Sequence, residues 1–294
     1  MGWYAISFTA FFFQEVIMAL PVAIQLYSVR DALEADFEGT LRAIKAMGYD
    51  GVEFAGLCGN DPAYVKALVE EIGLVPISAH ITTDDFINGG GVDKVLDMYK
   101  SIGVKYVALP YLLEDRWPGS EGWTETHALM MYAGVCAAKR GMQLLYHNHD
   151  FEFKNKIDGQ YMLEYMYDSI PAEYLASELD TCWVNIGGEN PADYIRKFTG
   201  RAPVVHIKDF FYSGKLPKRL YDLIGIDEED VEEEEGTFEF RPAGHGMQDV
   251  PSILQASLDA GSEWVVFEQD NPSAGMTPME CAEKAVTFIK GCEW

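Results

Sequence analysis

One stretch of the sequence reads Ala137-Ala138-Lys139-Arg140-Gly141-Met142-Gln143-Leu144-Leu145-Tyr146-His147. It joins the end of a helix-forming run to a glycine, and then to a short apolar run that closes on a polar residue. Glycine suits the left-handed position just beyond a helix end. Short apolar runs bounded in this way are typical of strands that are buried on both faces, as in parallel sheets.

The same pattern recurs along the chain. Further apolar runs stand between helix-forming segments at residues 22–27, 51–54, 75–80, 104–109, 174–180, 204–209 and 264–270. Eight strands that alternate with helices in a chain of 294 residues predict an α/β fold, a single (β/α)8 TIM barrel. An open doubly wound sheet is the alternative, but its glycine-rich phosphate-binding turn is absent after the first strand.

Composition limits the partners of this protein. The chain has 22 Lys and Arg against 47 Asp and Glu, a net charge of −25. That charge opposes binding to a nucleic acid or to an anionic membrane surface. The five cysteines are scattered and form no Cys-x-x-Cys pair, so we expect reduced thiols in a cytoplasmic protein.

Two segments lie outside the repeating pattern. Residues 1–17 contain the apolar run Phe8–Phe13, which no Lys or Arg precedes and which is too short to cross a bilayer. We expect an N-terminal extension there and the barrel over residues 18–294. An acidic insertion at about residues 210–244 contains Asp227–Glu235. We interpret it as a solvated segment on the active-site face, where it could act as a lid or a subunit contact.

Polar side chains gather where the predicted strands end. In a parallel barrel the carboxyl ends of all strands meet on one face, which carries the active site. The strand-end residues are Gln25, Tyr27, Glu53, His80, Leu109, His147, His149, Glu178, Asp180, His206, Lys208, Glu268 and Asp270. Seven of the eight strands therefore end in groups that ionise or form hydrogen bonds, which calls for a functional explanation.

Four of these residues have the chemistry of metal ligands. His147, Asp180, His206 and Glu268 come from four consecutive strands and offer two imidazoles and two carboxylates. Such a mixed set suits Mn²⁺, Zn²⁺, Co²⁺ or Fe²⁺, whereas two imidazoles disfavour Mg²⁺. A metal-free polar cluster is the alternative, but it would need unusual pairing to offset the desolvation of its charges. His149 stands two residues after His147, so in a strand both histidines point to the same face.

Six stretches together give the chain a family resemblance. They are Ile24–Asp31, Gly51–Phe54, Tyr146–Phe153, Leu179–Trp183, His206–Asp209 and Phe267–Asp270. On these stretches, from Pro21 to the C-terminus, the chain resembles the sugar phosphate isomerase/epimerase family of xylose isomerase-like barrels. The resemblance implies a divalent metal, with Asp180, His206 and Glu268 at metal positions. The fifth-strand position is usually Glu in the epimerases, and His147 stands there in this chain.

The resemblance also implies an activity. It implies a metal-dependent isomerase or epimerase that acts on a keto-sugar or a related polyol by proton transfer through an enediolate. The family's ketose epimerases use a carboxylate on each side of the reacting carbon. Here Glu268 matches one of them, and we predict that His149 is the second proton carrier because His147 is predicted to bind the metal. The residues predicted to contact the carbohydrate substrate are Lys208, Glu53, His80, Gln25 and Trp183.

Other functions on the same scaffold stay open. A dehydratase of the inosose type, or a lyase that acts on keto-glycosides, would use the same residues. A non-catalytic sugar-binding barrel or a partner subunit would not need every ligand, and a homo-oligomer is compatible with the sequence. A DNA repair endonuclease of this superfamily would need a trinuclear zinc site and a basic face, which six histidines and a charge of −25 oppose.

Overall fold

The computed structural model of the chain describes residues 19–215 and 236–294. The predicted extension at residues 1–17 and the acidic run Asp227–Glu235 lie outside these residues. Among the described residues, no helix combines the length and the apolar character that crossing a bilayer requires. The thiols of all five cysteines are free, as the sequence predicts.

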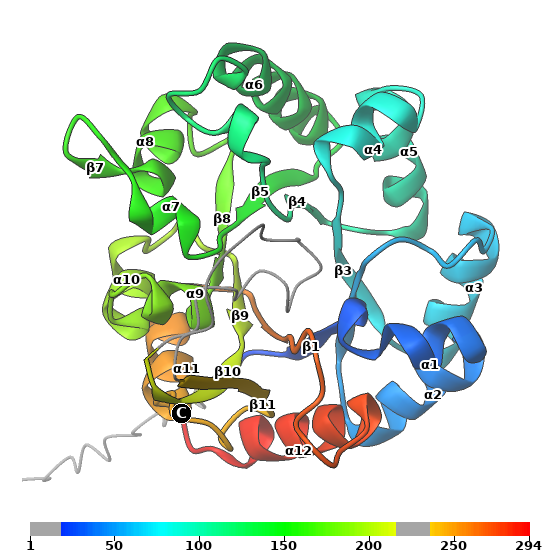
Figure 1. Cartoon of the computed structure of the whole chain (residues 1–294). Coiled ribbons are helices and arrows are strands. Elements are labelled where there is room, and N and C mark those ends of the chain that lie inside the picture. The colour runs from blue at the N-terminus through cyan, green and yellow to red at the C-terminus, as the bar shows by residue number, and fades with distance from the viewer. Residues whose placement is uncertain (1–18, 216–235) are drawn as a thin grey trace, which may run out of the picture.

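Eight parallel strands form a closed barrel, which confirms the predicted fold. In the order in which they pair, they are β1 (Val22–Gln25), β12 (Trp264–Phe267), β9 (Val204–Ile207), β8 (Ala176–Asp180), β5 (Gln143–His147), β4 (Tyr106–Leu109), β3 (Val75–His80) and β2 (Gly51–Phe54). Figure 1 shows these strands around the centre of the molecule, with the helices arranged around them.

Helices connect the strands and cover the outside of the barrel. They are α1 (Arg30–Ala35), α2 (Phe37–Met47), α3 (Pro62–Ile72), α4 (Thr83–Asn88), α5 (Val92–Ile102), α6 (Trp123–Lys139), α7 (Phe151–Lys154), α8 (Met162–Ser169), α9 (Thr181–Ile186), α10 (Pro191–Lys197), α11 (Val250–Asp259) and α12 (Pro278–Gly291). Two 3-10 turns, η1 (Leu26–Val29) and η2 (Glu114–Arg116), precede α1 and α6. Gly141 follows α6 with a φ of +66°, which is the left-handed conformation expected of a glycine after a helix.

The barrel interior changes from apolar to ionic along the strands. A buried cluster that includes Ala176, Val204 and Val266 fills its lower part, toward the amino ends of the strands. Side chains alternate across a strand, so the next inward positions lie two residues further on. In β8 these positions are Glu178 and Asp180, both fully buried. The apolar layer thus supports a polar layer near the carboxyl ends.

A two-stranded antiparallel ribbon follows β9. It pairs β10 (Asp209–Gly214) with β11 (Gly236–Arg241) and forms the described part of the predicted insertion at about 210–244. Phe210 and Phe240 of the ribbon pack with Trp183 of α9 in a small buried cluster. A short antiparallel hairpin of β6 (Lys156–Ile157) and β7 (Gln160–Tyr161) follows α7 in the chain.

Candidate metal centre

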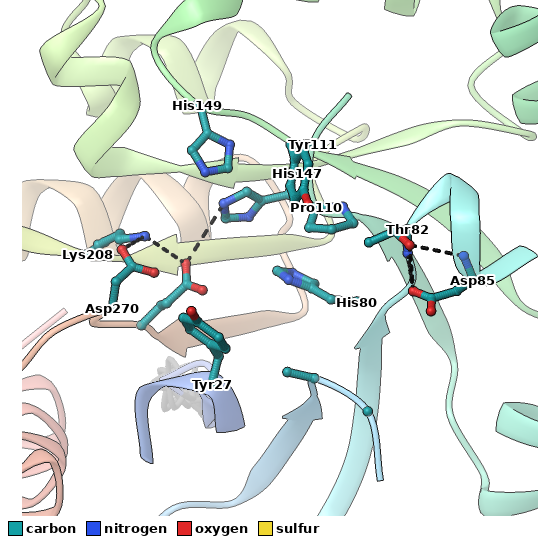
Figure 2. A pocket seen from close by; sticks show the side chains of 13 residues that line it. Tyr27, His80, Thr82, Asp85, Pro110, Tyr111, His147, His149, Lys208 and Asp270 are labelled. Carbon is teal, nitrogen blue, oxygen red and sulfur yellow. Dashed lines mark hydrogen bonds and ion pairs between the residues drawn. The ribbon is translucent and has the colours of Figure 1, made fainter. Parts of the chain in front are cut away.

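A cavity of about 390 Å³ opens at the carboxyl ends of the strands. Among its lining residues are His80, His147, His149, Lys208, Glu268 and Asp270. Figure 2 shows His147 and His149 one above the other, with Lys208 and Asp270 beside them. The described residues therefore bring side chains from β3, β5, the turn after β9 and the turn after β12 into one cavity, as the strand-end pattern predicts.

The four predicted ligands stand together, and we call them the ligand group: His147, Asp180, His206 and Glu268. Each offers one ligand atom, and these atoms all lie within 4.8 Å of one another. His147 Nε2 lies 3.8 Å from Asp180 Oδ2 and 3.9 Å from Glu268 Oε2. Such gaps are too wide for hydrogen bonds, and they are close to the separations of atoms that share one cation at about 2.0–2.2 Å.

Asp180 shows how the chain holds a ligand in place. Its Oδ1 accepts a hydrogen bond from the backbone N–H of Trp183 in the first turn of α9, and its own N–H donates to Asn148 Oδ1 at 3.0 Å. Its Oδ2 is buried and has no hydrogen-bond partner among the described residues. A buried carboxylate oxygen without a partner is costly. A cation in the ligand group would satisfy it, so the residues present fit a divalent metal.

Beneath the ligand group lies a second set of polar residues, all fully buried except the partly exposed His80, which we call the lower layer: Gln25, Glu53, Ser78, His80 and Glu178. His80 Nε2 lies 2.6 Å from Glu178 Oε1 and 3.1 Å from Glu53 Oε1. Gln25 Nε2 donates to Glu53 Oε1 at 2.6 Å, and the Ser78 hydroxyl donates to the other oxygen of Glu53. The lower layer touches the ligand group, since His147 Nδ1 lies 3.2 Å from Glu178 Oε1.

Burial and neighbouring charges raise the pKa values of residues in both sets. Burial, with Glu268 beside it, raises the pKa of Asp180 to about 7, and burial with Glu53 nearby raises the pKa of Glu178 to about 7. Burial alone would lower the pKa of His80, but Glu53 and Glu178 outweigh it and raise that pKa to about 10. The site thus places acids and imidazoles whose protonation states depend on one another.

His147 lies where its neutral form is favoured. Burial is the largest cause that lowers its pKa well below the usual value, and the positive charge of His206 adds to it. A neutral imidazole is the form that binds metals. Burial also opposes a charge on His206, but Glu178 and Glu53 outweigh it and raise that pKa well above the usual value.

His149 reaches the cavity by a different route from the one the sequence suggests. His149 is not part of the strand, contrary to the prediction, because β5 ends at His147 and His149 lies in the segment that follows. The two rings nevertheless meet, with centroids 5.3 Å apart. The ring of His149 stacks on Phe151, and its backbone N–H donates to Glu152 Oε2 at 2.9 Å. Burial and the charge of Lys208 lower its pKa to about 3, so the ring is neutral.

Lys208 is the buried cation of the site. Its Nζ lies 2.6 Å from Asp270 Oδ2, 3.2 Å from Glu268 Oε2 and 3.7 Å from Asp180 Oδ2. Burial opposes its charge, but Asp270 and the other two carboxylates outweigh that effect and raise its pKa well above the usual value. The ammonium group lines the cavity and can donate to a bound molecule.

The remaining predicted site residues lie in two places. His80 lines the cavity with Lys208, whereas Gln25, Glu53 and Trp183 are fully buried and lie outside the lining. The lining also contains Asp85 and Tyr111, which the sequence analysis does not name. Both come from segments after β3 and β4 that carry no strand-end or motif signal, so only the folded chain reveals them.

Comparisons with known proteins agree with this architecture. Residues 41–292 match the model of the xylose isomerase-like TIM barrel family. An inosose dehydratase of Bacillus cereus (strain AH820) is 25% identical over 278 residues, which cover 87% of this chain and 90% of that protein.

Two solved structures share the fold. A sugar phosphate isomerase/epimerase from Parabacteroides distasonis ATCC 8503 superposes with a TM-score of 0.71 at 20% identity, covering 94% of this chain and 95% of that one. The IolI protein with a bound zinc atom superposes with a TM-score of 0.63 at 15% identity, covering 92% and 96%. At these identities the likeness shows the fold alone.

Proposed function

Because this chain belongs to the xylose isomerase-like TIM barrel family, we propose that it is a metal-dependent isomerase or epimerase of a keto-sugar or a keto-cyclitol. The observation that carries the proposal is the ligand group. Four side chains offer two nitrogen and two oxygen ligands within 4.8 Å of one another, of which His147 and Glu268 line the cavity, and one buried oxygen of Asp180 has no hydrogen-bond partner in the described part of the chain. Such a donor set suits Mn²⁺, Zn²⁺, Co²⁺ or Fe²⁺.

A cation held by His147, Asp180, His206 and Glu268 would supply Lewis-acid stabilisation of the negative charge that develops on the substrate oxygens. The chain's own residues supply the proton transfer. The neutral ring of His149 faces the cavity and can accept the proton next to the substrate carbonyl. Lys208 donates to a substrate oxygen and favours the negative charge of an enediolate.

The fate of the proton decides the product. If His149 keeps the proton that it removed and Glu268 or water delivers another to the opposite face of the same carbon, the product is an epimer. If the removed proton returns to the neighbouring carbon, the product is an isomer. Deuterium from D2O enters the substrate or product when the protonated carrier exchanges with water before it gives the proton back, which gives a direct assay.

A dehydratase is the second candidate, because a curated relative that matches 87% of this chain is an inosose dehydratase. The first step would be the same proton removal, followed by loss of a β-hydroxyl as water. Mass spectrometry of the product separates the two functions, since an epimer or isomer keeps the substrate's mass and a dehydration product lacks one water.

The test combines metal analysis with deuterium exchange. We expect Asp180→Ala and His206→Ala to lose bound metal, measured by atomic emission, and to lose deuterium incorporation from D2O into keto-sugars and inososes. His149→Gln should keep its metal and lose exchange by about 10²–10⁴-fold, because only the proton carrier is removed. Asp193→Ala is the control, since the Asp193 side chain is 81% exposed and its ion pair is with Arg196 on the same helix.

Two results would contradict the proposal. Full metal content in both Asp180→Ala and His206→Ala would show that the ligand group does not bind the metal. Undiminished exchange in His149→Gln would leave the metal assignment intact but would show that another group carries the proton.

A further inference from the structure

Glu178 and Glu53 are fully buried carboxylates that neither bind the proposed metal nor line the cavity. Both lie under the ligand group, with their oxygens directed at imidazole rings. Glu178 Oε1 lies 3.2 Å from His147 Nδ1 and 3.2 Å from His206 Nε2. Glu53 Oε1 lies 3.0 Å from His206 Nε2. Burying two carboxylates in a barrel core is expensive, so their placement needs a reason.

Each of the two ligand imidazoles directs one ring nitrogen at the lower layer and the other at the ligand group. His147 places Nδ1 toward Glu178 and Nε2 toward Asp180 and Glu268. His206 places Nε2 toward Glu53 and Glu178, and Nδ1 toward Glu268. Each ring therefore joins the lower layer to the ligand group.

His80, His147, Glu178 and His206 also offer ligand atoms within 4.8 Å of one another, but the separations around His147 favour the ligand group. In the lower layer, the 2.6 Å between His80 Nε2 and Glu178 Oε1 has room only for a proton. In the ligand group, the gaps of 3.8 and 3.9 Å around His147 Nε2 are open. A lower-layer cation would also need His80 to leave both of its carboxylate partners.

We propose that Glu178, which His80 bridges to Glu53, positions the metal-binding His147 by accepting the N–H of Nδ1, the ring nitrogen that faces away from the cation. This inference rests on the proposed metal site and adds a function for residues beneath it. A ligand histidine commonly donates its second N–H to a carboxylate, which fixes the tautomer and the orientation of the ring. His147 would thus bind through Nε2 because Glu178 holds Nδ1–H.

The carboxylates are themselves held rigidly. Glu53 accepts hydrogen bonds from Gln25 and Ser78, and His80 bridges Glu53 and Glu178. Gln25 and Glu53, which the sequence predicts to bind substrate, would therefore hold the lower layer in place instead of contacting the substrate. His80 has one edge in the cavity and its Nε2 in the lower layer.

The test measures the histidines directly and then removes the carboxylates. In the zinc-loaded wild-type protein, ¹⁵N–¹H NMR of the imidazoles should show His147 protonated at Nδ1 and bound through Nε2. Glu178→Gln, and to a similar degree Glu53→Gln, should weaken zinc affinity about 10–100-fold in competition with a chelating dye. The His147 N–H signal should shift in Glu178→Gln.

Glu152→Gln is the matched control. Glu152 is also buried, and it undergoes the same chemical change, but its oxygens accept from Tyr146 Oη and the backbone N–H of His149 instead of a ligand imidazole. We expect its zinc affinity to equal that of the wild type. Circular dichroism of each variant checks the fold, and the wild-type NMR measurement needs no variant.

Three outcomes would overturn the inference. One is zinc bound through Nδ1 of His147, which would place the ion in the lower layer. The second is unchanged zinc affinity and an unchanged His147 signal in Glu178→Gln, while Asp180→Ala loses zinc. The third is a wild-type protein that binds no divalent metal, which would remove the proposed function as well.

Discussion

At the scale of single residues, Glu152 is a carboxylate whose protonation should be visible in the stability of the whole protein. It is 1% exposed and accepts hydrogen bonds from Tyr146 Oη at 2.6 Å and from His149 N–H at 2.9 Å. Burial raises its pKa to about 8 from an ordinary value of 4.5, although these hydrogen bonds oppose the shift. The folded protein therefore binds this proton more tightly than the unfolded chain does.

The sign of the pH effect follows from that difference. The stabilisation by this proton is complete below pH 4.5 and is lost as the pH rises through about 8. Glu152 should thus reduce the free energy of unfolding between these values by at most about 1.4 kcal/mol per pH unit. Glu152→Gln removes the titration. In urea unfolding with a chelator present, the variant should gain stability relative to the wild type between pH 5 and pH 8, and parallel curves would contradict this.

The sequence predicts the chemistry of the site better than it predicts the neighbours of each atom. Strand-end polarity predicts that His147, Asp180, His206 and Glu268 face one cavity, and the structure brings them together. The partner of His147 Nδ1 is Glu178, which the sequence analysis leaves without a role. His147 and Glu178 are both polar strand-end residues in the sequence, and only the pairing of β5 with β8, which sets them opposite each other, shows that they are neighbours.

At the scale of secondary structure, Asp209 joins the ribbon to the barrel. Its carboxylate accepts backbone N–H bonds from Phe210 at 2.8 Å, Gly244 at 3.0 Å, Gly246 at 2.9 Å and Gln248 at 3.1 Å. A Cβ at position 246 would lie 2.2 Å from Asp209 Oδ1, so the close approach requires glycine. Asp209 thereby fixes the turn after β11 next to the end of β9, where Lys208 enters the cavity.

We therefore expect Asp209→Ala to loosen this turn. Unsatisfied backbone donors should destabilise the protein by about 1–3 kcal/mol in urea unfolding. Amide exchange should accelerate at residues 244–248 and stay unchanged in α12, which serves as the internal control. Equal exchange rates in the turn of wild type and variant would show that the four hydrogen bonds do not hold it.

The pattern of helix, glycine and apolar run predicts where the strands lie, but it predicts the last residue of each strand less accurately. The predicted strands 22–27, 204–209 and 264–270 end at Gln25, Ile207 and Phe267 in the structure. A residue can continue an apolar or extended pattern after its backbone has stopped pairing with the barrel. Asp209 illustrates the cause, because it begins β10, which pairs with β11 instead of a barrel strand.

At the scale of the whole molecule, the net charge of the chain and the buried charges of the site affect different kinds of ligand. The net charge of −25 opposes a nucleic-acid ligand, whereas the buried charges concentrate at one end of the barrel. There, carboxylates outnumber the single buried lysine, Lys208, among the described residues. A divalent cation would balance part of this negative charge and satisfy Asp180 Oδ2. Assembly into a homo-oligomer, or with a partner chain, stays a prediction from the sequence.

The most direct test of the central claim is anomalous X-ray diffraction at the zinc edge from crystals of the zinc-loaded protein. The account predicts one strong peak within about 2.0–2.2 Å of His147 Nε2 and of ligand atoms of Asp180, His206 and Glu268. A peak between His80, Glu53 and Glu178, or no peak at the carboxyl ends of the strands, would contradict it.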